Sequence, residues 1–257
     1  MKNLYQYNKK LLIQIDDCWG EISPLQGFSK ETFEEAKEEI LQVLHENKQP
    51  TLPSVIWGLS VLPITAVRIP LCALNRPRDG CKTLKLKVGH LSVENAVRHV
   101  SQYIDQYRLR IDCNRKWTLN QALEFTRHFR STDFEYLEEP TKELIEFSKL
   151  TDFSIALDES LRDNINIPNA KYAVIKPSLT GHIPKLSLPT VLSSSYETSL
   201  GILQIARLAS QEIAHGLDTF VDDIIDPPIR VEEGYLIWSP SKNPINTSKL
   251  CKLATVP

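Results

Sequence analysis

The sequence predicts an α/β protein in which helices cover a parallel sheet, and a closed (β/α) barrel accounts best for its pattern. The first observation is an alternation, from about residue 84 onward, of short runs rich in Val, Ile and Leu with amphipathic segments. The second is that polar side chains repeatedly stand at the ends of these apolar runs. The third is length, because 257 residues suffice for one barrel and a small additional piece.

Six apolar runs predict six consecutive strands, each followed by a connection. They are residues 84–88, 109–112, 134–139, 154–160, 172–177 and 190–195. Their near-continuous apolar character indicates parallel strands that are buried on both faces. Residues 70–75 before them and 214–220 after them bring the count to eight, the number in a closed barrel. A doubly wound open sheet fits the same alternation and stays open as an alternative.

Helix-start signals support this alternation. Ser92 is a suitable N-cap, and apolar side chains follow it at helical spacing as far as Tyr107. Thr118, with Gln121 three residues later, forms a capping box before the next helix. Thr141 is expected to open a short helix, and residues 200–209 form an apolar helical stretch.

The first 60 residues have a different pattern and predict a small domain packed on the barrel. A loop rich in Gly and Pro is followed by a helix that carries Phe33, Ala36, Ile40, Val43 and Leu44 on one face. We expect residues 1–65 to form this domain, completed in part by residues 225–257, and residues 66–224 to form the barrel.

Composition excludes several classes of function. The formal net charge of -2 provides no basic field, so neither nucleic acid nor an anionic membrane is an expected partner. No run approaches the roughly 20 apolar residues that span a bilayer, and the polar start predicts a cytoplasmic protein. The five cysteines are scattered and include no C-x-x-C pair, which indicates reduced thiols. Phosphate-binding loops and nucleophile elbows are absent, and the oligomeric state is not indicated.

Charged and hydroxyl side chains stand at the ends of consecutive predicted strands. In chain order they are Lys85 and Lys87, Asp112, Glu138 or Glu139, Asp158 and Glu159, Lys176, and Ser193 to Ser195. Each step along this series is about one strand–helix unit. In a closed barrel these side chains would converge on the face that carries the chemistry.

Three carboxylates on successive strands, with lysines on the strands before and after, predict a metal site flanked by ammonium groups. Oxygen ligands without His or Cys suit Mg²⁺ or Mn²⁺. Of the adjacent pair, one glutamate is expected to face the metal and its neighbour to support it. Taken singly, a surface lysine, a loop-forming Asp112 or a helix-capping Asp158 would be ordinary. Their joint register favours a site.

The residues that carry this pattern lie in recognisable blocks. These are WGEISPLQGFSKET, KLKVG, LRIDCNRKWT, YLEEPTK, IALDESLRD, VIKPSLTG, LSSSYETSLG and GLDT, in this order between residues 19 and 219. The chain thereby resembles the enolase superfamily, and specifically its o-succinylbenzoate synthase family of menaquinone biosynthesis. The resemblance implies an α/β fold, an enolase-type modified (β/α) barrel with a small, truncated N-terminal α+β capping domain.

The resemblance also implies roles for individual residues. Asp112, Glu138 and Asp158 would bind Mg²⁺, with Mn²⁺ as an alternative, while Lys87 and Lys176 would flank a small carboxylate substrate. Lys85 would lower the pKa of Lys87 by like-charge repulsion. Residues expected near the substrate are Arg110, Ser193, Ser194 and Gly216, and those expected to support the metal site are Asn114 and Glu159.

The implied activity is that of a Mg²⁺-dependent lyase. It would perform the syn-dehydration of 2-succinyl-6-hydroxy-2,4-cyclohexadiene-1-carboxylate to o-succinylbenzoate through a metal-stabilised enediolate. N-acylamino acid racemisation and dipeptide epimerisation, within the same superfamily, are alternatives because two opposed lysines can exchange a proton on either face. A degenerate barrel that binds without turnover is a third.

The chain departs from the family pattern in three places. Only 18 residues precede WGEIS, too few for the usual first strands of a capping domain and for the mobile loop that closes over substrate. Residues 76–83 are too few for a helical crossover, so the first barrel helix is expected to be lost or reduced. Residues 180–189 include Pro184 and Pro189 and leave little room for a helix after Lys176.

Overall fold

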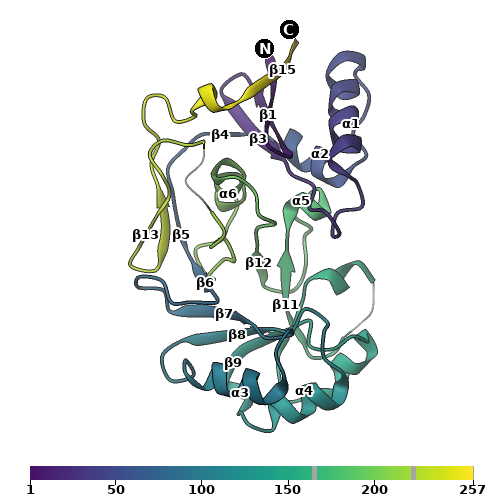
Figure 1. The fold of residues 1–257 in the computed structure, drawn as a ribbon, viewed down its shortest axis with the longest axis vertical. Helices are drawn as coiled ribbons and strands as arrows, with labels where there is room; N and C mark the ends of the chain where they lie inside the picture. Colours follow the sequence, from purple (N-terminus) through teal and green to yellow (C-terminus); the bar gives the residue numbers. More distant parts are fainter. Residues whose placement is uncertain (164–166, 221–223, 257) are drawn as a thin grey trace.

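A computed structural model describes residues 1–163, 167–220 and 224–256 (Figure 1). The chain forms a small antiparallel sheet beside both termini and a curled parallel sheet that makes the larger part of the molecule. A third, three-stranded sheet runs along one side of the parallel sheet. The predicted boundaries at residues 65 and 224 stay predictions.

The N-terminal sheet has the order β15-β1-β2-β3-β4. Its strands are β1 (Lys2–Tyr7), β2 (Lys10–Ile15), β3 (Cys18–Ile22), β4 (Leu62–Pro63) and β15 (Cys251–Val256). The expectation that the residues before Trp19 are too few for strands is wrong. Two tight turns, in which Asn8 and Asp16 take positive φ angles of 53° and 51°, fit two hairpins into this segment.

Helices α1 (Phe33–Glu46) and α2 (Pro53–Leu59) complete this part of the molecule. Thr32 and Glu35 form a capping box at the start of α1, and Pro53 occupies the first turn of α2. The predicted apolar face of α1 is buried through Ala36, Ile40 and Leu44, which pack against side chains of the antiparallel sheet. A 3₁₀ turn, η4 (Thr247–Lys249), precedes β15.

The parallel sheet has the order β12-β11-β10-β9-β8-β7-β6 and confirms the predicted strands. The strands are β6 (Cys72–Leu74), β7 (Thr83–Lys87), β8 (Arg108–Asp112), β9 (Phe134–Glu138), β10 (Ile155–Leu157), β11 (Ala170–Ile175) and β12 (Thr190–Leu192). Neighbours in sequence are neighbours in the sheet, and all of these pairs are parallel.

Residues 214–220 were expected to form a strand, but within the described part of the chain they form two isolated bridges instead. His215 pairs with Leu71 beside β6, and Gly216 pairs with Ser193 beside β12. Backbone hydrogen bonds of 2.9 to 3.1 Å support both pairings. Because β6 and β12 are the two edges of the sheet, this segment fills the eighth position and closes the barrel.

The helices around the barrel are uneven. α3 (Val93–Ser101), α4 (Leu119–Thr126) and α6 (Ser199–Ala206) are the longest, and α3 ends six residues before the predicted Tyr107. Short 3₁₀ helices η1 (Ser131–Asp133), η2 (Leu144–Lys149) and η3 (Glu159–Asp163) occupy other connections. The helix after Lys176 is reduced to α5 (Pro177–Thr180), as the two prolines predicted.

No helix lies in the described connection between β6 and β7, which confirms the predicted loss. The connection packs instead on the sheet formed by β13 (Arg230–Glu232), β14 (Tyr235–Trp238) and β5 (Val67–Pro70). Gly80 allows this close approach, since a Cβ there would lie 2.4 Å from the carbonyl carbon of Glu233. Among the described residues, none of the helices is long and apolar enough to cross a membrane.

Candidate active site

The predicted site residues lie in register at one end of the barrel. Lys87, Asp112 and Glu138 are the last residues of β7, β8 and β9, and each is paired with the next across the sheet. Asp158 and Lys176 directly follow β10 and β11. The carboxyl ends of five neighbouring strands therefore bring these side chains together.

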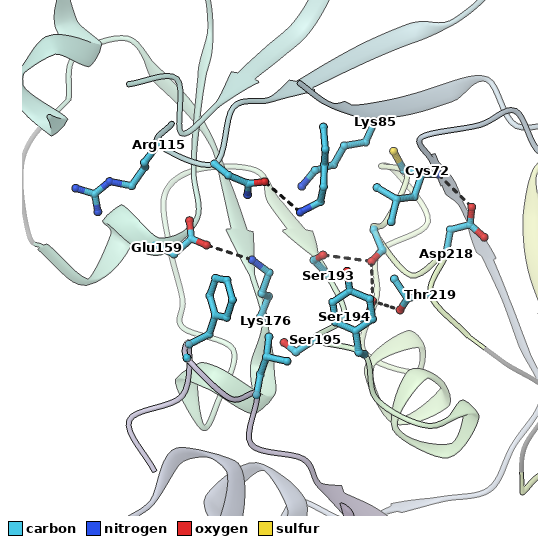
Figure 2. Close-up of a pocket in the computed structure, with 18 of the residues that line it drawn as sticks. Cys72, Lys85, Arg115, Glu159, Lys176, Ser193, Ser194, Ser195, Asp218 and Thr219 are labelled. Atoms are coloured by element: carbon cyan, nitrogen blue, oxygen red, sulfur yellow. Dashed lines mark hydrogen bonds and ion pairs between the residues drawn. The ribbon is translucent and has the colours of Figure 1, made fainter. Parts of the chain in front are cut away.

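A cavity of about 560 Å³ opens above this row of residues (Figure 2). The residues that were predicted for the site from the sequence and that line this cavity are Lys85, Lys87, Asn114, Glu159, Lys176, Ser193, Ser194 and Gly216. Leu25, Gly27 and Phe28, from the loop after β3, add a wall that belongs to the N-terminal part of the molecule. These residues come after Ile22, so the wall does not depend on the residues that precede Trp19.

Lys85 lies between two carboxylates beneath the cavity. Its Nζ donates to Glu138 Oε1 and lies 3.0 Å from Asp112 Oδ2. Burial disfavours the charged ammonium, but the negative charges of Asp112 and Glu138 prevail and raise the pKa of Lys85 well above its ordinary value. Lys85 is therefore a fixed cation, and its charge is largely neutralised by its partners.

Lys87 is the most accessible of the three cavity lysines, with 34% of its side chain exposed against 11% for Lys85 and 15% for Lys176. Its Nζ lies 3.4 Å from Asp112 Oδ2 and 3.5 Å from Asn114 Oδ1. Asn114 is held in turn by Asp112, whose Oδ1 accepts its backbone N–H at 3.0 Å. Lys87 thus faces the cavity with weak, long contacts.

Lys176 enters the cavity from the other side of the barrel. β7 and β11 stand four places apart in a ring of eight positions, so Lys87 and Lys176 face each other across it. Lys176 Nζ pairs with Asp158 Oδ2. It also lies 3.8 Å from Glu159 Oε1 (Figure 2). Burial opposes the charge of Lys176, yet the two carboxylates raise its pKa above the ordinary value.

The adjacent glutamates have different surroundings. Glu138 points into the barrel, where burial first and the charge of Asp112 second raise its pKa to about 8. Glu139 follows with a φ of +45°, and its Oε1 accepts the backbone N–H groups of Asp158 and Ser160 at 2.7 and 3.0 Å. Glu139 therefore supports the segment that carries Asp158.

The donor set suits a hard divalent cation. Glu138 Oε2 is buried and accepts no hydrogen bond from the described residues, and Asp112 Oδ2 is buried with the ammonium groups of Lys85 and Lys87 at 3.0 and 3.4 Å. In the part of the chain that the structure describes, no three acidic, His or Cys side chains converge closely enough to enclose an ion. The reason is that Lys85 lies between Asp112 and Glu138 while Lys176 pairs with Asp158. An ion would compensate the unsatisfied Glu138 Oε2 once the pair of Lys176 and Asp158 opens.

Two known proteins resemble this chain over most of its length. The chain is 36% identical to the o-succinylbenzoate synthase of Klebsiella pneumoniae (strain 342), across 78% of each chain. It is 33% identical to the o-succinylbenzoate synthase of Pasteurella multocida (strain Pm70), across 84% of this chain and 82% of that one. The chain belongs to the o-succinylbenzoate synthase family. The resemblance drawn from the sequence blocks is thereby confirmed.

Other matches agree with membership of the o-succinylbenzoate synthase family. Residues 4–65 match the family "MenC, N-terminal domain", and residues 71–169 match "Enolase C-terminal domain-like". The o-succinylbenzoate synthase from Thermosynechococcus elongatus BP-1, solved with Mg in its active site, superposes with a TM-score of 0.61 at 23% identity, covering 82% of this chain and 83% of that one. The L-Ala-D/L-Glu epimerase from Bacillus subtilis gives 0.71 at 17% identity, covering 92% and 89%. These two structures show the shared fold.

Arg110 was predicted to lie near the substrate, but it does not line the cavity. It lies one row below Asp112 inside the barrel, where its guanidinium donates to Glu135 Oε2 and to the carbonyl oxygen of Ala214. Side chains alternate between the two faces of a strand, so Arg110 and Asp112 point to the same face. Arg110, two residues earlier in β8, lies deeper in the barrel than Asp112. Arg110 therefore links β8 and β9 to the closing segment.

The hydroxyl groups of Ser193, Ser194 and Ser195 differ in their hydrogen bonding, which the sequence did not indicate. The Ser193 and Ser194 hydroxyls both donate to the Gly216 carbonyl oxygen, and Ser194 also bonds Thr219 (Figure 2). Ser195, which was not among the predicted substrate contacts, lines the cavity with an Oγ that has no hydrogen-bond partner among the described residues. The strand-end pattern did include Ser195, but no local signal separates it from its two neighbours.

Proposed function

We propose that this protein is an o-succinylbenzoate synthase, a Mg²⁺-dependent lyase. It would convert 2-succinyl-6-hydroxy-2,4-cyclohexadiene-1-carboxylate to o-succinylbenzoate and water. The observation that carries the proposal is the pair of opposed lysines with three carboxylates on the strands between them. Membership of the family, at 33 to 36% identity to two named synthases, supports the choice of substrate.

Lys87 is the group suited to move the proton. Its ammonium has only long contacts and reaches the cavity, so in its neutral form it can accept the proton alpha to the substrate carboxylate. The same Nζ can then return this proton to the departing hydroxide on the same face, releasing water. Proton and leaving group are balanced, and no other reactant is needed.

Lys176 is suited to a different task. Asp158 and Glu159 favour its charged form and raise its pKa, and Glu159 would stay beside it once Asp158 turns to a metal ion, so we assign Lys176 the protonated role. A fixed ammonium opposite Lys87 stabilises the negative charge that develops on the substrate. Lys85, also held as a cation, favours the ionised form of Asp112, while its effect on Lys87 by like-charge repulsion stays a prediction.

Asp112, Glu138 and Asp158 are the residues that would hold Mg²⁺, or Mn²⁺ in its place. When bound, the ion supplies positive charge to a substrate carboxylate whose neighbouring C–H is otherwise too weakly acidic for a lysine. Asn114 would support Asp112 through its backbone N–H, and Glu159 would support the site through its contact with Lys176. The unsatisfied Glu138 Oε2 and the all-oxygen donor set support this assignment.

The test is formation of o-succinylbenzoate from the cyclohexadiene substrate, with and without Mg²⁺, by the wild type, Lys87→Ala and Lys176→Ala. Turnover that needs Mg²⁺ and is lost in both variants is expected. Full activity of Lys87→Ala would remove the proposed base. A folded, Mg²⁺-binding wild type without turnover would overturn the synthase assignment.

Exchange of a proton alpha to a carboxylate is the second candidate. Lysines on opposite faces can remove a proton from one side and return one from the other, and the fold superposes on a dipeptide epimerase with a TM-score of 0.71. Assays with N-succinylamino acids and dipeptides, followed by loss of optical rotation or by deuterium uptake from solvent, separate this activity from dehydration. A barrel that only binds would show neither reaction.

A further inference from the structure

Glu21 of the WGEIS block is a buried carboxylate that the reaction scheme does not use. It lies on β3 in the antiparallel sheet and is fully buried. Its carboxylate nevertheless reaches the barrel, where it accepts the backbone N–H groups of Thr198 and Gly201 at 3.0 Å and the hydroxyl of Thr198. These groups form the first turn of α6, so an internal anion occupies the positive end of that helix.

Close approach of this carboxylate is built into the helix. Gly201 leaves space for Glu21, since a Cβ at position 201 would lie 2.6 Å from Glu21 Oε2. The backbone N–H of Glu21 donates to Gln204 Oε1 at 2.9 Å, and Gln204 Nε2 donates to the carbonyl oxygens of Trp57 and Ser60. β3 and α2 therefore hold α6 along two turns (Figure 1).

A second buried carboxylate continues the connection toward the cavity. Glu197 accepts the Ser178 hydroxyl at 2.7 Å through Oε1 and the Ser195 backbone N–H through Oε2. Ser178 belongs to α5, the turn that starts directly after Lys176, and Ser195 lines the cavity. Glu197 thus connects the segment that follows Lys176 to Ser195 at the cavity wall.

Lys10 joins the same cluster from β2. Its Nζ donates to the carbonyl oxygen of Tyr196 and to Ser23 Oγ at 2.9 Å, and it lies 3.6 Å from Glu21 Oε1. Tyr196 has a φ of +63°, a backbone conformation that costs free energy unless its surroundings hold it. The small sheet therefore holds this segment at two points, Tyr196 through the ammonium of Lys10 and Thr198 through the carboxylate of Glu21.

We propose that Glu21 is a positioning residue for the proposed reaction: it transmits docking of the small sheet to residues 195–198 and, through Glu197 and Ser178, to Lys176. This inference rests on the proposed function for its kinetic consequence. Its structural consequence, order in two barrel segments, can be measured without turnover.

The experiment compares the full-length wild type with Glu21→Gln, Lys10→Met and Glu39→Gln. Glu39 is a matched control, because it too is a buried carboxylate that accepts the backbone N–H groups at a helix start, those of Thr51 and Leu52 before α2. Its contacts stay within the N-terminal part of the molecule. Lys10 is partly exposed, so its variant tests the cluster even where Glu21→Gln does not fold.

Two readouts are taken at a temperature at which every variant is folded. Glu21→Gln is expected to lower kcat by about tenfold to a hundredfold, the loss that a displacement near 1 Å causes, with a smaller change in KM. Hydrogen exchange at residues 177–180 and 195–201 is expected to accelerate, while that of β8 and β9 does not. Lys10→Met should give a smaller change of the same kind, and Glu39→Gln should keep the wild-type kcat.

Wild-type kcat and exchange in Glu21→Gln, or in Lys10→Met where only that variant folds, would overturn the inference. An equal loss of kcat in Glu39→Gln would also overturn it, because the effect would then follow stability alone. If the wild type has no turnover, the proposed function fails, and the exchange comparison alone decides the role of Glu21.

Discussion

His215 makes the stability of the barrel depend on pH. It is fully buried, its Nδ1 accepts the Leu192 backbone N–H at 2.9 Å, and its Nε2 lies 3.0 Å from the carbonyl oxygen of Ser210. These contacts fit the neutral ring, since protonation of Nδ1 would break the first of them. Burial, helped by the charge of Arg110, lowers the pKa of His215 from 6.5 to about 4.

The sign and size of the effect follow from linkage. Between pH 6.5 and about 4 the unfolded chain binds a proton that the folded protein does not, so stability is full above pH 6.5 and falls as pH is lowered. At 1.36 kcal/mol per pKa unit, the total loss is about 3 kcal/mol, of which about 2 kcal/mol has been lost at pH 5.

The assay is urea unfolding of the wild type and His215→Gln at pH 7 and pH 5. Glutamine keeps an acceptor and a donor but does not titrate, so the variant should lose about 2 kcal/mol less than the wild type between the two pH values. Other titrating groups are common to both proteins and cancel in this difference. His128→Gln, at an exposed position, should behave as the wild type. Equal pH dependence of the wild type and His215→Gln would refute the reasoning.

Three further predictions concern the site and its scaffold. Glu139→Ala leaves the backbone N–H groups of Asp158 and Ser160 buried without an acceptor. It should therefore lower the free energy of unfolding in urea by about 3 kcal/mol and weaken Mg²⁺ binding. Unchanged values of both would contradict the supporting role of Glu139. Gly80→Ala combines a φ of +64° with a clash against the β13–β14 turn and should lower the melting temperature by several degrees, whereas an unchanged melting temperature would show that the turn yields freely. Mg²⁺ at about a hundred times its Kd should stabilise the wild type by about 2.7 kcal/mol in thermal unfolding; an equal gain in Asp112→Asn would exclude Asp112 as a ligand.

The sequence predicts the barrel well because its strands are rich in Val, Ile and Leu and their polar ends recur at steps of about one strand–helix unit. Strand pairing then follows, since each strand lies beside the next along the chain. The small sheet is harder to predict, because its first hairpins depend on positive φ angles at Asn8 and Asp16 rather than on loop length. Its outer edge is completed by β15, a contact between distant residues that has no local signal.

At the candidate site, the sequence indicates which residues meet but not how they pair. That Lys85 is bound between Asp112 and Glu138 could not be predicted, because this pairing depends on depth inside the barrel; its expected repulsion of Lys87 stays a prediction. Arg110 shares a strand face with Asp112 but lies too deep to line the cavity. The bridge from Glu21 to α6 joins residues 177 positions apart, which no spacing pattern reveals.

Closure of the barrel by two residues has a consequence for its local stability. Six strand junctions are full ladders, whereas His215 and Gly216 join β6 and β12 through single bridges. Subglobal opening starts where the fewest backbone hydrogen bonds must break, so this junction is where the ring should first part. Ser193 and Gly216 border the cavity at this junction, so opening there would disturb one wall of the cavity while the strands that carry Lys87 and Lys176 stay paired.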